Sequence, residues 1–295
     1  MTNYPNGLSS QGVPLFGGVQ DISGKTYFVD GNSGNDGNDG STWAKAMKTC
    51  AVAFAASHAD IADGAQKHWA RRNTVYIAGD TFTENLVAFP QKTDVIGVGS
   101  DDGFSMACIE GNHAPVNASL GTRFYNVRFL TKTAVVIVTL ASTSSGTQFI
   151  NCLFDATGSA ATATRGILAT ASPYLKVIGC QFQGAFVTSY ITFGTGQAMG
   201  TVIQDNIMVQ SAAGGILTGA GTTASYMGVI RGNLVQAVGV AIDTQATSVF
   251  VVADNTFIST AALGSGSFVC DLTFAANNVI TGNDISRSLP FITIA

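Results

Sequence analysis

The chain has 295 residues, with 14 Lys or Arg against 18 Asp or Glu, and a net charge of −4. This balance leaves no basic footprint for nucleic acid. Purely apolar runs, such as residues 134–138, are too short for a membrane-spanning helix. From Pro115 onward there are only two Lys, five Arg and six Asp. So few charges favour an exterior that is either rich in uncharged polar residues or covered by another chain.

Residues 1–24 form the first predicted segment, an extended arm with turns. Gly and Pro are frequent there and interrupt any regular periodicity. We expect this arm to anchor the protein to a partner. The residues that we expect to make the anchoring contacts are Tyr4, Pro5, Val13, Pro14, Leu15 and Phe16.

Residues 25–73 are predicted to form a strand, a loop and a helix that caps the rest of the chain. The strand is residues 25–30, and the helix begins with Ser41 or Thr42 as its N-cap. An apolar helix face would plug the open end of a stacked core, where strand edges are otherwise unpaired. That face would contain Trp43, Ala46, Met47, Cys50 and Phe54.

The loop before this helix, residues 31–40, is rich in Gly, Asn and Asp. Asp30, which directly precedes the loop, and Asp36 and Asp39 within it are the candidates for a Ca²⁺ site, because Ca²⁺ takes oxygen ligands. The loop lacks the register and the closing Glu of an EF-hand, so a surface turn is the preferred interpretation. We therefore expect no cofactor and no bound metal.

Residues 74–295 carry a four-residue signature that recurs seven times, with a mean step of about 26 residues, as stacked repeats do. Each signature follows a short apolar or β-branched run bounded by turn formers, which indicates strands. One such coil cannot bury its own apolar face, so the coils must stack. We predict about eight coils of an all-β, single-stranded, right-handed parallel β-helix. The seven signatures lie at 126–129, 151–154, 179–182, 205–208, 232–235, 254–257 and 282–285.

The columns of this alignment predict where the side chains point. The first column holds Asn, Asp and Gly, which tolerate a left-handed backbone and mark a corner. In the second column, four Asn one coil apart are expected to form an inward ladder with satisfied amides: Asn206, Asn233, Asn255 and Asn283. The fourth column is expected to be an apolar core stack: Phe129, Phe154, Phe182, Met208, Val235, Phe257 and Ile285.

The segments at residues 27–30 and 74–84, with the loop and helix between them, resemble the opening of pectate-lyase-like β-helix proteins. That family includes polysaccharide lyases, glycoside hydrolases and many phage tailspikes. The arm is similar to the start of short β-helix proteins of tailed bacteriophages. The resemblance implies the fold but says little about activity. The first residues show neither the basic nor the apolar region of a classical secretion signal, so we expect folding in the host cytoplasm and a final place in the virion.

A search for catalytic residues in the repeats finds only a small acidic group. Asp205 and Asp254 share the corner column two coils apart, about 10 Å by strand spacing, near the upper end for an inverting carboxylate pair. Arg231 precedes the intervening corner residue. The preferred interpretation is a corner column in which Asn, Gly and Asp interchange. If the protein is an enzyme, these three residues are the candidates.

We therefore expect a non-enzymatic phage virion protein, a homotrimer that decorates the capsid or belongs to a tail appendage. The arm would bind another virion protein, and neither nucleic acid nor membrane is an expected partner. The alternatives are a depolymerase, lyase or hydrolase, acting on host surface glycan, and a glycan-binding adhesin without turnover.

Overall fold

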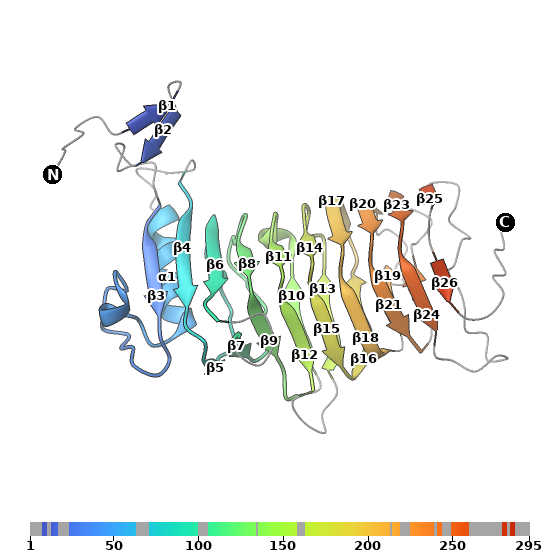
Figure 1. The fold of residues 1–295 in the computed structure, drawn as a ribbon, viewed down its shortest axis with the longest axis horizontal. Helices are drawn as coiled ribbons and strands as arrows, with labels where there is room; N and C mark the ends of the chain where they lie inside the picture. Colours follow the sequence, from blue (N-terminus) through green and yellow to red (C-terminus); the bar gives the residue numbers. More distant parts are fainter. Residues whose placement is uncertain are drawn as a thin grey trace.

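The computed structural model is an all-β, right-handed parallel β-helix. Its coils follow one another along a single axis, from α1 and β3 at one end to β25 and β26 at the other (Figure 1). The residues that the structure describes are 8–10, 13–16, 24–62, 71–99, 106–133, 135–157, 163–212, 214–218, 225–238, 241–243, 249–259, 279–281 and 284–286.

Three parallel sheets run along the rod, with ten, nine and five strands in the described residues. Sheet 1 contains β3 Thr26–Val29, β4 Asn73–Ile77, β6 Thr93–Gly97, β8 Arg123–Tyr125, β11 Gln148–Ile150, β14 Lys176–Ile178, β17 Gln197–Gln204, β20 Ser225–Arg231, β23 Val249–Ala253 and β25 Val279–Thr281. Sheet 2 contains β5 Thr81–Thr83, β7 Ala107–Glu110, β9 Val127–Leu130, β12 Leu153–Ala156, β15 Gln181–Gly184, β18 Ile207–Ala212, β21 Leu234–Ala237, β24 Thr256–Ser259 and β26 Asp284–Ser286. Sheet 3 contains β10 Val136–Leu140, β13 Ala163–Ala169, β16 Phe186–Phe193, β19 Gly214–Thr218 and β22 Ile242–Asp243.

A sharp corner joins each strand of sheet 1 to the following strand of sheet 2 in the repeat region. The corner residue has a positive φ, which Gly, Asn and Asp accept at lower cost than other residues. This backbone requirement explains the first column of the repeat. The φ values are 54° at Asn126, 51° at Asn151, 64° at Gly179, 54° at Asp205, 67° at Gly232 and 55° at Asp254.

The fourth column of the repeat lies inside the rod. Phe154 pairs with Phe129 on one side and Phe182 on the other, and its ring stacks on theirs at centroid distances of 5.4 and 4.6 Å. The column continues along the rod with Met208 and Val235, whose side chains are also fully buried. Backbone pairing extends it through Phe257 and Ile285. Each fully buried side chain stabilises the rod by about 1.5–3 kcal/mol.

The second column holds a ladder of buried amides. The Oδ1 atom of Asn233 accepts hydrogen bonds from the backbone N–H and the Nδ2 of Asn206, and Oδ1 of Asn255 accepts the same pair from Asn233. The Asn206, Asn233 and Asn255 Nδ2 groups also donate to backbone carbonyls. Cys180 continues the column, its N–H donating to Asn206 Oδ1. Asn283 lies outside the described residues.

The helix α1, Cys50–Ala62, covers the N-terminal end of the core, with Cys50, Ala53 and Phe54 buried against it. The sequence-based helix start at Ser41 or Thr42 is wrong, because residues 43–45 form only a 3₁₀ turn (η1, Trp43–Lys45). Trp43 is therefore not on the plugging face; its side chain is 44 % exposed. A second 3₁₀ turn, η2, is Ser142–Ser144.

The described parts of the arm form an antiparallel hairpin of β1, Leu8–Ser10, and β2, Val13–Phe16. Tyr4 and Pro5 lie outside the described residues. None of the described helices is both long and apolar enough to cross a membrane.

Candidate functional site

Asp205, Arg231 and Asp254 lie on three consecutive corners of the rod, at the ends of β17, β20 and β23. All three are exposed. No ion pair joins them among the described residues, and Asp205 instead accepts a hydrogen bond from the Gln204 side chain at 2.8 Å. Both Asp residues have the positive φ of the corner. They are thus placed by backbone conformation and line no described cavity.

The three Asp residues of the loop before α1 are each engaged in local structure. Asp30 and Asp39 accept hydrogen bonds from backbone N–H groups two residues further on. Asp36 accepts from the backbone N–H groups of Lys48 and Thr49, both at 2.9 Å, and so holds the chain before α1. Within the residues that the structure describes, no three His, Cys, Asp or Glu side chains gather as metal ligands.

A shallow groove of about 390 Å³ lies at the ends of β5, β7 and β9. Its Glu84 accepts hydrogen bonds from the first two N–H groups of α1, one on each oxygen at 2.8 Å. Its Glu110 pairs with Lys132 at 2.6 Å. The carboxylates of the groove therefore serve the helix cap and a cross-coil ion pair. The arrangement offers polar contacts but no carboxylate without a protein partner.

Asp155 is fully buried on the outer side of sheet 2. Burial raises the pKa of its carboxyl, but hydrogen bonds from Thr157 and Gln183 and the charge of Arg128 outweigh burial, and the net pKa is lowered. Arg128 Nη2 lies 2.6 Å from Asp155 Oδ2. This carboxylate is satisfied within the fold, so it acts as a structural ion pair and not as a reactive acid.

The outer face of sheet 1 near α1 carries a row of aromatic rings. Phe28, Tyr76 and Tyr125 alternate with buried inward neighbours and are half-buried themselves. Phe28 lies opposite Tyr76 in the strand register and stacks on it at 5.6 Å. The exposed Trp43 packs against Phe28 at 4.8 Å. The rings thus continue outward from the sheet at its N-terminal end.

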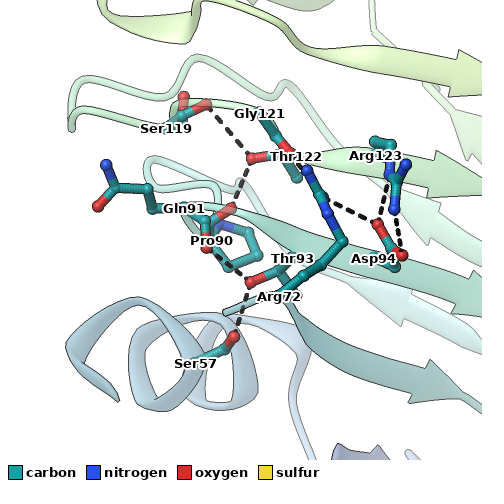
Figure 2. Close-up of polar contacts among 10 residues, drawn as sticks. All are labelled: Ser57, Arg72, Pro90, Gln91, Thr93, Asp94, Ser119, Gly121, Thr122 and Arg123. Carbon is teal, nitrogen blue, oxygen red and sulfur yellow. Dashed lines mark hydrogen bonds and ion pairs between the residues drawn. The ribbon is translucent and has the colours of Figure 1, made fainter. Parts of the chain in front are cut away.

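Beside these rings, Asp94 holds two guanidinium groups (Figure 2). Arg123 binds Asp94 through Nε and Nη2, both at 2.6 Å, and Arg72 Nη1 lies 2.9 Å from the same carboxylate. Arg72 Nη1 also donates to the Gly121 carbonyl. The Arg123 guanidinium carbon lies 5.9 Å from the centre of the Tyr125 ring. We call Trp43, Phe28, Tyr76, Tyr125, Arg72, Asp94 and Arg123 the aromatic–arginine face.

Buried hydroxyls behind this face hold its strands in place. Thr93, which precedes Asp94, bonds the Ser57 side chain of α1 and the Gln91 carbonyl, and Thr122, which precedes Arg123, bonds the Pro90 carbonyl (Figure 2). The face carries two positive charges against one negative charge. The pKa of the nearby Lys92 is lowered by burial and by the charge of Arg72, which agrees with a locally positive field.

Further along sheet 1, the outer face becomes apolar. Val202 pairs with Val229, Val229 with Val251, and Met227 with Val249. The exposed fractions are 50 % for Met227, 41 % for Val249 and 39 % for Val251. We call Val202, Met227, Val229, Val249 and Val251 the valine face. Apart from Thr201, the inward side chains of these strands are also apolar, namely Ile203, Ile230, Phe250 and Val252, so both faces of the sheet are largely apolar here.

Sequence reasoning missed both faces. It identified the strand at residues 25–30 and the stacked repeats after residue 74, but the outward grouping depends on the register that sets Phe28 beside Tyr76 and Asp94 beside Arg123. The sequence signal that could have revealed the outward rings is the alternation of inward and outward residues along the strands that contain Tyr76 and Tyr125. Neither a family model, nor a curated protein, nor a solved structure matches the chain.

Proposed function

We propose that the protein is a non-enzymatic structural rod that assembles with copies of itself, as a homotrimeric virion protein of a tailed bacteriophage. The observation that carries the proposal is the valine face. Strands that are apolar on both faces belong to sheets that are covered on both faces, and exposed contiguous apolar patches mark interaction sites. The core already covers the inward side of these strands, so a partner is needed for the outward side.

The charges beside the valine face favour a second copy as that partner. Asp205, Arg231 and Asp254 follow its strands at the corner and alternate in sign along the rod. They are exposed and form no described ion pair with each other. In a trimer, three parallel rods would turn this face toward a common axis, and Arg231 of one copy would meet an Asp of the next. Opposite charges set in this way would fix the register between copies.

Mass measurement in solution tests the assembly. Wild-type protein should give three times the 30.3 kDa mass of the chain in light scattering, and Val251→Lys should give the monomer, because a buried ammonium without a partner is costly. Val116→Lys is the matched control, since Val116 is 80 % exposed outside the valine face. A monomeric wild-type protein would refute the proposed trimer. A trimeric Val251→Lys would show that the subunits associate through a face other than the valine face.

The place in the virion rests on the arm, whose sequence resembles the start of tailed-phage β-helix proteins. The proposed role of residues 1–24 is to attach the rod to a capsid or tail protein. Deleting them should abolish incorporation into particles and leave the trimer intact. Unchanged incorporation would count against this anchor.

One structural observation favours the alternative function of a depolymerase: the side chains of Asp205, Arg231 and Asp254 are exposed on neighbouring corners. Incubation of the purified protein with host capsule, followed by measurement of reducing ends and unsaturated uronates, separates the two functions. Release of either product by the wild type, and its loss in Asp205→Ala, would reverse the ranking.

A further inference from the structure

We propose that the trimer binds a tetrahedral oxyanion, phosphate or sulfate, on its axis, where Arg72 and Arg123 of all three copies hold it. This inference rests on the proposed trimer and adds to it a ligand site that no single copy contains. It follows from the charges that sheet 1 presents between α1 and the valine face.

The valine face and Arg123 share one outward column of sheet 1. Strand register links its members without a break, one residue per strand, from β6 to β23. Residues in register on a sheet point to the same side. A trimer that turns the valines toward its axis therefore turns Asp94 and Arg123 there as well. The column is Asp94, Arg123, Gln148, Lys176, Val202, Val229 and Val251.

The neighbouring outward column favours a covered face along the same coils. Its members from β3 to β14 are aromatic or aliphatic, and each is only half-buried in one copy. Contiguous apolar residues on a surface mark interaction sites. We infer that the contact between copies extends from the valine face to the arginines. These members are Phe28, Tyr76, Ile96, Tyr125, Ile150 and Ile178.

Positive charge is in excess at the arginine end of this face. Asp94 is balanced against Arg123 and Lys176 in its own column and against Arg72, which binds it from the side. Within the residues that the structure describes, no carboxylate pairs with Lys176. Each copy thus brings three positive charges and one negative charge to the axis. Like charges that meet at an interface are costly, so an anion between the copies would stabilise the trimer.

The two arginines are already positioned for an oxyanion. Asp94 holds Arg123 through Nε and Nη2, both at 2.6 Å, and Arg72 through Nη1 at 2.9 Å (Figure 2). The side chains of Arg123 and Arg72 remain 29 % and 34 % exposed in one copy, so N–H groups that Asp94 does not use reach solvent. Arginine forks bind phosphate and sulfate through paired hydrogen bonds, and a fork fixed in advance lowers the ordering cost of binding.

The symmetry of the trimer matches a tetrahedral anion. Packed sheets lie about 10 Å apart, a gap that arginine side chains from facing copies can span. On a three-fold axis, a tetrahedral oxyanion presents one equivalent oxygen to each copy and its fourth oxygen along the axis. Chloride offers no such set of acceptors, so phosphate and sulfate should bind more tightly than chloride.

Calorimetry on the full-length wild-type protein, dialysed into chloride buffer, tests the site with inorganic phosphate and sulfate as probes. Binding should saturate at one anion per three chains. A ligand that binds only the trimer favours assembly by mass action. Phosphate at about 100 times its Kd should therefore raise the association constant of the trimer about 100-fold at constant ionic strength, as measured by sedimentation equilibrium.

Arg123→Gln removes one fork from each copy and leaves Arg72 on Asp94. The affinity for phosphate should fall about tenfold or more, because charged hydrogen bonds are lost. Phosphate and sulfate also strengthen apolar association in general, but that effect would persist in Arg123→Gln and the effect of the site would not. Arg165→Gln is the control, since Arg165 bonds Thr192 on sheet 3, and it should respond like wild type.

A trimeric wild-type protein without saturable phosphate or sulfate binding refutes the axial site and leaves the proposed trimer intact. One anion per chain, or wild-type affinity in Arg123→Gln, refutes the assignment to arginines shared between copies. A protein that is monomeric with and without phosphate refutes both the trimer and the site. Should Arg123→Gln fail to assemble, Arg123→Lys keeps the charge and removes the fork, and the same loss of affinity is expected.

Discussion

At the scale of single residues, His113 is a buried titratable group whose protonation affects the stability of the fold. It is fully buried beside the Phe129 ring, at 5.5 Å between centroids. Its Nδ1 accepts the Leu86 N–H at 3.3 Å, so Nε2 carries the proton, and no described partner receives it. Burial lowers the pKa of His113 from 6.5 to about 4. The imidazole is therefore neutral in the folded protein at neutral pH.

This depressed pKa predicts a loss of stability in mild acid. Between pH 6.5 and 4 the unfolded chain binds a proton at His113 and the folded chain does not, so the free energy of unfolding falls as pH falls. The full effect of a shift of this size is about 3 kcal/mol. His113→Asn, whose Oδ1 can replace Nδ1 as acceptor, should remove most of this slope in urea titrations at stepped pH.

His58→Asn is the control for this titration. Burial also lowers the pKa of His58, but its side chain is only partly buried, so its contribution to the slope should be the smaller. Retention of the wild-type slope in His113→Asn would contradict the assignment. Carboxylates with a lowered pKa, such as Asp155, change the free energy of unfolding mainly below pH 4, which lies outside the pH range in which His113 titrates.

At the scale of elements, the helix α1 depends on carboxylates from other parts of the chain. Glu84, at the end of β5, accepts the first two N–H groups of α1, and a negative charge there also suits the positive end of the helix. Glu84→Ala should cost about 1–2 kcal/mol and should speed hydrogen exchange in the first turn of α1. Glu110→Ala, which removes a partly exposed ion pair with Lys132, should cost about 0–1 kcal/mol and leave exchange in α1 unchanged. Equal exchange in the two variants would refute the capping role.

The same contacts show what local sequence can and cannot predict. The corner residues and the Asn ladder follow from columns of the repeat, because each coil presents the same backbone geometry. The start of α1 at Cys50 does not, because its N–H partners come from Glu84 and the preceding chain is held by Asp36. Local signals around Ser41 therefore placed the helix start too early. The aromatic–arginine face was missed for a related reason, since Asp94 meets Arg123 only once the strands are in register.

At the scale of the whole molecule, the rod is a stack in which each coil contacts its neighbours. The charged network of sheet 1 lies near α1, the stacked Phe rings lie in the middle coils, and the amide ladder begins where the Phe column gives way to Met208 and Val235. Different interactions therefore stabilise successive parts of one continuous core. A stack of this kind transmits a local defect mainly to adjacent coils.

A cavity in the middle of the stack tests how far a defect spreads. Phe154→Ala removes a ring stacked on both Phe129 and Phe182 and should destabilise its region by about 3–5 kcal/mol. Hydrogen exchange should then accelerate most in β9, β12 and β15, and least in β4 and β23. Phe154→Leu leaves a smaller cavity and should produce the same pattern with a smaller amplitude. Equal acceleration from β4 to β23 would show instead that the rod opens as a single cooperative unit, and that its coils are coupled beyond their nearest neighbours.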